Sequence, residues 1–368
     1  MKKRILAVLL ILCLALSLLP AGVLADDTPT SGSCGENLTW TLEDGVLTIS
    51  GTGPMDDYGW NRPHRAPWIE DYKDCDKITK IVIAPGVTSV GNTAFFQCKN
   101  VTDVTIPNSI TAIGKDAFRE CYSLTDVMIP GSVTTIGDFA FAYCHSFTSV
   151  TIPEGVTFIG ESAFCCCRNL GRVDIPASAT VIQGGAFGLC DALTDIRVAE
   201  GNPEVLVKDG MLYDNGGKRL IFGGSQKGVC TIPEGVTAIG PSAFEWCDAL
   251  TGVTIPDSVT VIGDSAFWEC SNLTEIVIPD SVTVIEDFAF ADCVKLADIT
   301  MPDSVTYIGD YAFDSCSMTE MTIPDGVTYI GEHAFWFCTE LTSMTIPSSV
   351  DTIGAGVLSF CSSLSELR

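Results

Sequence analysis

The chain has 368 residues, 46% of them hydrophobic, and a formal net charge of −26 at neutral pH. Such an excess of acid repels nucleic-acid phosphates and anionic lipid headgroups, which excludes nucleic acid and anionic membranes as partners. The length alone would favour two or three globular domains, but an internal repeat overrides that expectation.

The first 25 residues predict a cleaved secretion signal. Residues 1–4 contain three basic side chains, residues 5–19 form an almost unbroken apolar run, and small residues precede the end at Ala25. This order is typical of a bacterial Sec signal peptide cut after Ala25. Cleavage would leave 17 basic and 46 acidic residues, a net charge of −29. No later apolar stretch reaches the roughly 20 residues of a membrane span. We therefore expect a secreted or cell-surface protein with no membrane insertion of the mature chain.

Residues 26–80 are expected to form a β-rich module that caps the repeats. Two runs of alternating apolar residues flank the turn signal Asp44-Gly45, a pattern that predicts two antiparallel strands. Cys34 and Cys75 lie in this module, outside the 23-residue cysteine series of the repeats, and are the best candidates for a disulfide in a secreted chain. Residues 63–68 are interpreted as a loop that leads into the array.

A unit of about 23 residues, V-x-I-P-x-x-V-T-x-I-G-x-x-A-F-x-x-C-x-x-L-T-x, then recurs eleven times. Five copies fill residues 81–195 and six fill residues 230–368, while the turn signals in 196–229 predict a β-hairpin insert. The copies begin at Ile81, Val104, Val127, Val150, Val173, Cys230, Val253, Ile276, Ile299, Met321 and Met344. One unit cannot bury its apolar residues alone, so stacked units must share a core.

Each repeat position has a mechanical interpretation. The V-x-I segment is expected to form a short strand with one buried face. Proline ends this strand because it has no N–H group to donate to a neighbouring strand. Glycine permits a corner, and the acid after it is expected to cap a short helix that carries the Ala-Phe pair and the cysteine. A cysteine recurs at the same position of each repeat, which indicates that it packs in the core, since a free cysteine behaves as a small buried hydrophobe. We expect this cysteine column to be unbridged.

These positions predict an α/β repeat solenoid, a horseshoe of eleven coils with one short parallel strand and one short helix per coil. The run I-P-x-x-V-T-x-I-G-x-x-A-F-x-x-C resembles the BspA-type leucine-rich repeat of bacterial surface proteins, from Ile81 to Arg368. The residues around Cys34 are similar to the module that often precedes such repeats. The resemblance implies surface proteins that bind host extracellular proteins, host cells or other bacteria.

A search for chemistry finds no catalytic set, so we expect no enzyme activity, no cofactor and no metal. The three histidines are far apart in the sequence and lack the spacing of metal ligands. Cys165-Cys166-Cys167 contains one residue of the cysteine column, and local substitution is preferred to a redox or metal site. A column of aspartates after the proline could attract calcium, but it lacks a Gly-punctuated calcium loop and is interpreted as a solvated face.

Aromatic residues at variable repeat positions are the candidate binding residues, because exposed Trp and Tyr often anchor interfaces. The alternative is that they pack over the edges of neighbouring coils. The candidates are Trp246, Trp268, Tyr307, Tyr311, Tyr329, His333, Trp336 and Phe337.

The sequence therefore predicts an interaction protein, such as an adhesin, that binds an extracellular protein or glycan. The alternative is a structural component of a matrix or surface layer that self-associates through its uncapped C-terminal coil. An ice-binding threonine surface is weakened by the charged residues that interrupt the array.

Overall fold

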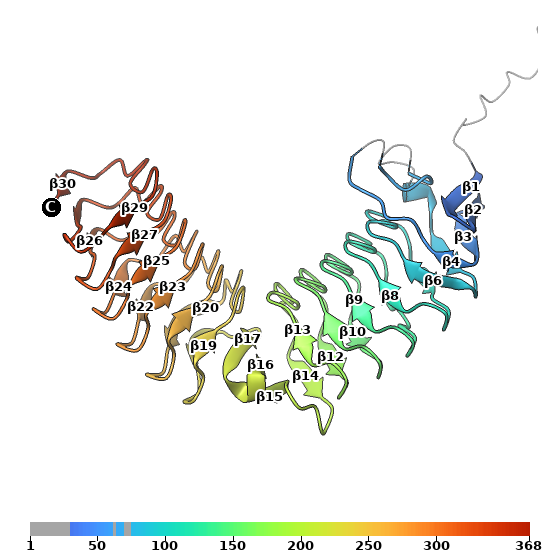
Figure 1. The fold of residues 1–368 in the computed structure, drawn as a ribbon, viewed down its shortest axis with the longest axis horizontal. Helices are drawn as coiled ribbons and strands as arrows, with labels where there is room; N and C mark the ends of the chain where they lie inside the picture. Colours follow the sequence, from blue (N-terminus) through green and yellow to red (C-terminus); the bar gives the residue numbers. More distant parts are fainter. Residues whose placement is uncertain (1–29, 62–63, 70–74) are drawn as a thin grey trace, which may run out of the picture. The chain divides into compact units, whose positions relative to one another are not determined.

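A computed structural model describes residues 30–61, 64–69 and 75–368 of the chain, and residues 31–368 form one compact unit. The signal peptide predicted over residues 1–25 lies outside the described residues. The unit is a solenoid of about 12 coils, which confirms the repeat architecture (Figure 1). A regular coil has three sides: two carry a short strand, and the third is a run of turns.

The first side carries the V-x-I strand in every repeat except the one that begins at Val127. Parallel pairing joins these strands from coil to coil, for example Val150 to Val173. The strands are β5 (Lys80–Ile83), β7 (Asp103–Thr105), β10 (Ser149–Thr151), β12 (Arg172–Ile175), β14 (Asp195–Val198), β18 (Gly228–Thr231), β20 (Leu250–Thr254), β22 (Glu275–Val277), β24 (Asp298–Thr300), β26 (Glu320–Thr322), β28 (Ser343–Thr345) and β30 (Glu366–Leu367).

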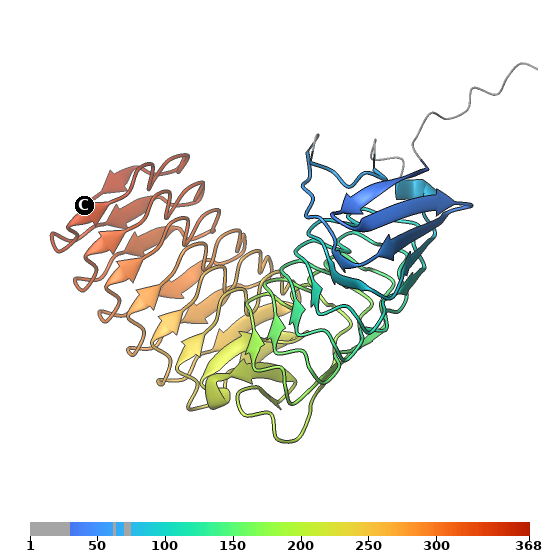
Figure 2. The same cartoon turned by 45° about the vertical axis from the view of Figure 1, so that its right-hand side comes forward.

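The second side holds a shorter strand, which in most repeats follows V-T and ends on a buried isoleucine. These strands also pair in parallel, and Figure 2 shows strands of consecutive coils lying side by side. They are β4 (Gly53–Pro54), β6 (Val87–Val90), β8 (Ala112–Ile113), β9 (Thr135–Ile136), β11 (Phe158–Ile159), β13 (Val181–Ile182), β17 (Arg219–Phe222), β19 (Ala238–Ile239), β21 (Val261–Ile262), β23 (Val284–Ile285), β25 (Tyr307–Ile308), β27 (Tyr329–Ile330) and β29 (Thr352–Ile353).

The third side, called here the turn side, is not helical, so the prediction of one short helix per coil is wrong. In the coil that begins at Val127, Phe139 and Tyr143 have φ of 54° and 62°, far from helical values. Their N–H groups donate to Glu161 O and Cys165 O of the next coil, at 2.8 and 2.7 Å. The helical elements in the described residues are the short 3₁₀ turns η1 (Cys75–Lys77) and η2 (Asn215–Gly217).

Coil spacing explains why turns replace helices. Phe118 and Phe141 stack in consecutive coils with ring centroids 5.2 Å apart, close to the spacing of about 4.8 Å between strands. Two packed helices need about 8–10 Å between their axes. A helix in every coil would therefore force the strands on the other two sides out of hydrogen-bonding distance.

The repeated polar residues serve the contacts between coils. The acid after the corner glycine caps no helix, contrary to expectation. Instead, Asp287 Oδ1 accepts the backbone N–H of Asp310 at 2.8 Å, and Asp310 Oδ1 accepts that of Glu332 at 2.7 Å. The cysteine thiols act similarly, since Cys293 Sγ lies 3.1 Å from Phe267 O of the preceding coil. Fourteen of the sixteen described cysteines are buried, so they occupy packing positions in the core.

The N-terminal module closes the first coil with an antiparallel sheet. Its strands are β1 (Ser31–Gly35), β2 (Leu38–Glu43) and β3 (Val46–Gly51), and β3 pairs in parallel with β5 of the array. Strands β2 and β3 are the two strands predicted on either side of Asp44-Gly45, where both residues have positive φ. The buried phenylalanines of consecutive coils stack in a row, and Trp40 and Trp68 extend this row into the N-terminal module. The ring centroids of Trp68 and Phe95 are 5.5 Å apart.

The interruption at residues 196–229 contains the predicted hairpin. Strands β15 (Leu206–Lys208) and β16 (Met211–Asp214) pair antiparallel, and β16 also pairs antiparallel with β17. Strand β17 then pairs in parallel with β19, so the insert supplies the second side of one coil. The insert also separates two hydrophobic clusters of the core.

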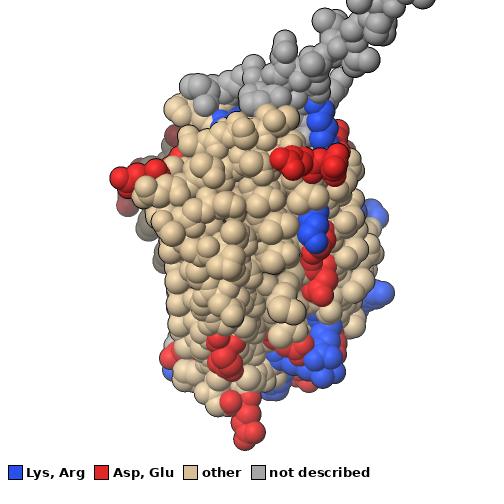
Figure 3. Space-filling view, turned by 90° about the vertical axis from the view of Figure 1, so that its right-hand side faces the viewer, with Lys and Arg blue, Asp and Glu red and all other residues tan. Residues whose placement is uncertain are grey.

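Charged side chains follow the stacking of the repeats. On the first side, Lys80 pairs with Asp103 of the next coil at 2.6 Å, and Arg172 lies 3.9 Å from Asp195. Figure 3 shows charged residues gathered into a column beside a largely uncharged surface. The side chains of these pairs are about half exposed, so each pair contributes little to stability, about 0–1 kcal/mol.

Candidate functional site

The structure divides the eight predicted aromatic candidates into three groups. Tyr311, His333, Trp336 and Phe337 lie together on the turn side near the C-terminal end of the array. The Trp246 and Trp268 rings meet edge to face in two earlier coils, with centroids 5.9 Å apart. Tyr307 and Tyr329 stack at 4.8 Å on the second side, in strands β25 and β27. Binding by any of these residues remains a prediction.

The C-terminal group belongs to a longer row that we call the aromatic strip. It consists of Phe288, Tyr311, His333, Trp336, Phe337 and Phe360. The Tyr311 ring stacks on Phe288 at 4.9 Å and on His333 at 4.9 Å. Trp336 then contacts both Phe337 and Phe360, at 5.4 and 5.6 Å. Six rings from four consecutive coils thus form one continuous surface.

Backbone conformation explains why these rings face outward. Phe288, Tyr311 and His333 directly precede the buried alanine of their repeats, and their φ values are 52–55°. Phe337 and Phe360 directly precede the column cysteine or its equivalent, with φ of 57° and 63°. The residues between them, such as Phe290 and Phe335, are fully buried. Positive φ thus reverses the chain twice per coil and leaves these side chains outside the core.

The strip remains partly accessible to solvent. The exposed fractions of Phe288, Phe337 and Phe360 are 37%, 46% and 64%. Large apolar residues gathered on a surface are characteristic of interaction sites. Aromatic packing between coils, the alternative stated above, accounts for the ring contacts but not for this exposure.

Sequence reasoning missed Phe288 and Phe360, although a positional signal was present. Phe288 lies one repeat before Tyr311, at the same position of the unit, and Phe360 lies one repeat after Phe337. Their shared repeat positions are the sequence signal that identifies both residues.

Aromatic rings also lie on the N-terminal coils, but cations already cover them. The Arg119 guanidinium is 4.6 Å from the Trp60 ring centroid, 5.2 Å from Phe139 and 5.5 Å from Tyr143. Such cation–π contacts stabilise the surface and occupy the ring faces. The C-terminal strip is therefore the stronger candidate for a ligand.

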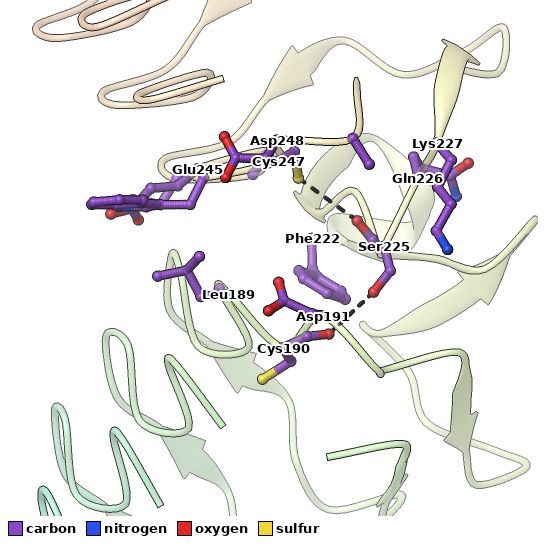
Figure 4. Close-up of a pocket in the computed structure, with 16 residues that line it drawn as sticks. Leu189, Cys190, Asp191, Phe222, Ser225, Gln226, Lys227, Glu245, Cys247 and Asp248 are labelled. Atoms are coloured by element: carbon purple, nitrogen blue, oxygen red, sulfur yellow. Dashed lines mark hydrogen bonds between the residues drawn. The ribbon is translucent and has the colours of Figure 1, made fainter. Parts of the chain in front are cut away.

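A cleft of about 310 Å³ opens on the turn side where the insert interrupts the array. Figure 4 shows Leu189, Cys190 and Asp191 on one side of it and Glu245, Cys247 and Asp248 on the other. Phe222 and the segment 224–227 close its inner end, where Ser225 Oγ donates to Cys190 O at 3.1 Å. Trp246 also lines this cleft.

The cleft exists because the insert supplies no turn side of its own. Its chain runs from β17 directly through residues 223–227 into β18, so the turns of residues 184–190 and 241–247 face each other. They meet closely at one end, where a Cβ on Gly184 would lie 2.7 Å from Pro241 O. They diverge at the other end, which leaves the space lined by Asp191 and Asp248.

The cleft presents acidic and amide groups beside an indole ring. Asp191 and Asp248 are exposed, whereas Glu245 is half-buried, and burial raises the pKa of its carboxyl. Hydrogen bonds from the side chains of Ser242 and Trp246 oppose that rise. Such a lining can accept hydrogen bonds from a hydroxylated or amine-bearing group of a few heavy atoms.

Acidic side chains beside the aromatic rings predict a stability that decreases as pH rises. Burial, followed by repulsion from Asp292, raises the pKa of Glu269 to about 7, and mainly burial raises that of Asp314 to about 6. The folded state thus binds these protons more tightly than the unfolded state, whose carboxyls titrate near pH 4. The stabilisation is complete below about pH 4 and is lost between about pH 4 and 7. We expect a lower Tm at pH 8 than at pH 5, measured by thermal unfolding at constant ionic strength.

Glu269→Gln should reduce this difference in Tm, because it removes one titrating group. The matched control is Asp280→Asn, which neutralises an exposed acid of the same array. Equal pH dependence in the Glu269→Gln variant and the parent would contradict the prediction.

Neither metal nor membrane chemistry is evident in the part of the chain that the structure describes. Within residues 30–61, 64–69 and 75–368, no cluster of three or more His, Cys, Asp and Glu side chains could hold a metal ion. Nor does any helix in these ranges have the length and apolar character needed to cross a membrane.

Comparison with solved structures places this solenoid among bacterial leucine-rich repeat proteins. A leucine-rich repeat protein from Eubacterium ventriosum is 27% identical, with a TM-score of 0.69 over 92% of this chain and 85% of its own. A leucine rich cell surface protein from Faecalibacterium prausnitzii is 28% identical, with a TM-score of 0.56 over 94% and 96% of the two chains. The pneumococcal vaccine antigen PcpA is 19% identical and shares the fold, with a TM-score of 0.53 over 91% and 86%.

No curated protein matches the sequence. The family model described as "BspA type Leucine rich repeat region" matches six times, over residues 70–194, 221–319 and 260–368. These matches cover most of the chain and agree with the repeat observed in the structure. The chain therefore belongs to the BspA-type leucine-rich repeat family.

Proposed function

We propose that this protein is a secreted or cell-surface binding protein that holds an extracellular protein or glycan against the aromatic strip. The observation that carries the proposal is the continuity of six aromatic rings, three of them on exposed residues. Aromatic side chains supply large contact areas at low cost in conformational entropy, which is why they dominate binding hot spots.

The solenoid supports this role because it holds the strip rigidly. Under the strip, consecutive coils hydrogen-bond to one another on the second side, where β23, β25, β27 and β29 pair. They also hydrogen-bond on the turn side, as in Phe313 N to Ala334 O at 2.8 Å. The rings are therefore arranged before a ligand arrives, which lowers the entropic cost of binding. The description of the Faecalibacterium relative as a cell surface protein supports an extracellular location.

The test is a binding array of extracellular-matrix proteins and glycans, probed with the full chain. Trp336→Ala and Phe337→Ala should each weaken binding at least tenfold, because each removes a ring from the centre of the strip. The matched control is Val277→Ala, which truncates a side chain that is 70% exposed on the first side of the solenoid. Thermal unfolding of every variant separates loss of binding from loss of folding.

Unchanged binding by well-folded Trp336→Ala and Phe337→Ala proteins would refute the role of the strip. Trp246→Ala forms a separate arm of the experiment, since Trp246 lines the cleft and lies outside the strip. Light scattering over a concentration series tests the self-association alternative. A mass that increases with concentration and returns to that of a monomer in Phe360→Ser would assign the strip to contacts between copies.

A further inference from the structure

The cysteine column begins one cysteine earlier than the sequence alone predicted. Cys75 precedes Cys98 by one repeat period, so it occupies the column position of a coil before the first complete one. The sequence favours pairing of Cys75 with Cys34, but the structure places the Cys75 thiol against that of Cys98. The Sγ atoms of Cys75 and Cys98 lie 2.9 Å apart.

Elsewhere in the column the thiols point at carbonyl groups. Cys121 Sγ lies 3.4 Å from Phe95 O, and Cys144 Sγ lies 3.4 Å from Phe118 O, each in the preceding coil. In the layer before Cys98, Trp68 stacks on Phe95. The Cys98 thiol lies against that of Cys75, whose Sγ is also 3.5 Å from Phe96 O.

The separation of these two sulfurs is best explained by a bond. An S–H group is a weak donor and sulfur a weak acceptor, so a thiol–thiol hydrogen bond offers little to hold the atoms at 2.9 Å. A disulfide requires Cα atoms about 4.4–6.8 Å apart. Neighbouring layers here pair in parallel through β3 and β5, and paired strands lie about 4.8 Å apart, which is within that range.

We propose that Cys75 and Cys98 form a disulfide that fastens the segment before the array to the first complete coil. Two other arrangements fit less well. Cys165 and Cys166 have Sγ atoms 3.4 Å apart, but consecutive Cα atoms are only about 3.8 Å apart, too close for an unstrained disulfide. The thiol of Cys34 lies in a separate environment near Asp56.

The bond forms by thiol–disulfide exchange with an oxidant that itself contains a disulfide, such as a small-molecule disulfide or an oxidoreductase. One thiolate attacks the oxidant and releases one of its sulfurs as a thiol. The second thiolate then displaces the remaining sulfur, so the pair loses two protons and two electrons and the oxidant's disulfide is reduced to two thiol groups. Burial holds the pKa of Cys98 well above its usual value, so this exchange is fastest before the coil closes.

The supply of an oxidant rests on the extracellular location in the proposed function, whereas the pairing rests on geometry alone. The full chain is therefore folded in a buffer containing oxidised and reduced glutathione, then alkylated and digested without reduction. We expect a cross-linked peptide pair containing Cys75 and Cys98, lighter by two hydrogen atoms than the separate peptides. Alkylation of both residues, or a link from Cys75 to Cys34, would overturn the proposal.

A second measurement gives the effect of the bond on stability. Reduction should lower the Tm of the parent protein by several degrees, because it opens a covalent loop the length of one repeat. Cys75→Ser should abolish this sensitivity to reductant, and Cys121→Ser, in the next coil of the column, should retain it. Because each variant is compared with itself in the two redox states, any general loss of stability cancels. Equal sensitivity of the parent and Cys75→Ser would contradict the proposal, while leaving the binding function of the strip untouched.

Discussion

Phe290→Ala is expected to destabilise the protein by about 3–5 kcal/mol, because it deletes one ring from the centre of the aromatic core ladder. Phe290 is fully buried, and its ring stacks on Phe267 at 5.2 Å and on Phe313 at 5.4 Å. The neighbouring coils cannot close the resulting cavity, since backbone ladders hold their spacing on three sides. Urea unfolding followed by circular dichroism measures the change in free energy.

Phe288→Ala is the matched control for this prediction. It removes the same side chain two residues earlier in the same coil, where the ring is 37% exposed. We expect a loss of about 1 kcal/mol or less, because most of the cost of a core truncation comes from lost burial and the cavity. A similar loss for both variants would show that the ladder is not the main source of stability.

Gly309→Ala is expected to cost about 3 kcal/mol, at the upper end of the range for overpacked cores. A Cβ at this corner would lie 2.5 Å from Asp287 N and 2.5 Å from Glu286 C of the preceding coil. Both are backbone atoms that cannot turn aside. The two coils would have to separate, which would also weaken the hydrogen bond from Asp310 N to Asp287 Oδ1.

The matched control is Gly131→Ala, in a turn whose glycine has no positive φ. A Cβ at Gly131 would find only Glu154 O nearby, at 3.4 Å. We expect a change within about 0.5 kcal/mol, since surface substitutions away from special features have small effects. Thermal and urea unfolding of the two variants would decide the matter, and a tolerated Gly309→Ala would show that coil spacing is adjustable.

The corner glycine shows which features of a repeat position follow from the sequence and which follow from the stacking of coils. The recurrence of this glycine predicted a corner, and the structure contains one. The sequence interpretation explained the glycine by its conformational freedom. At Gly137 and Gly309 φ is not positive, and the constraint is the close approach of the preceding coil. A contact between residues one repeat apart depends on the spacing of coils, which no single repeat encodes.

The binding residues show the same limit. Aromatic residues at variable positions could be selected from the sequence, but their grouping could not. Tyr307 and Tyr311 are close neighbours in the sequence, yet they lie on different sides of the coil. The cleft beside Trp246 could not be predicted from a motif. It forms because the insert lacks a turn side.

The sequence by itself determined the solenoid, because a short repeat with buried Val, Ile, Ala, Phe and Cys can satisfy its apolar residues only by stacking. It also located the interruption and the antiparallel strands around Asp44-Gly45. Only the tertiary structure decided that turns replace helices, that acids bond to the next coil, and that Cys75 meets Cys98. These features depend on the narrow spacing between coils, which arises once strands on two sides pair with their neighbours.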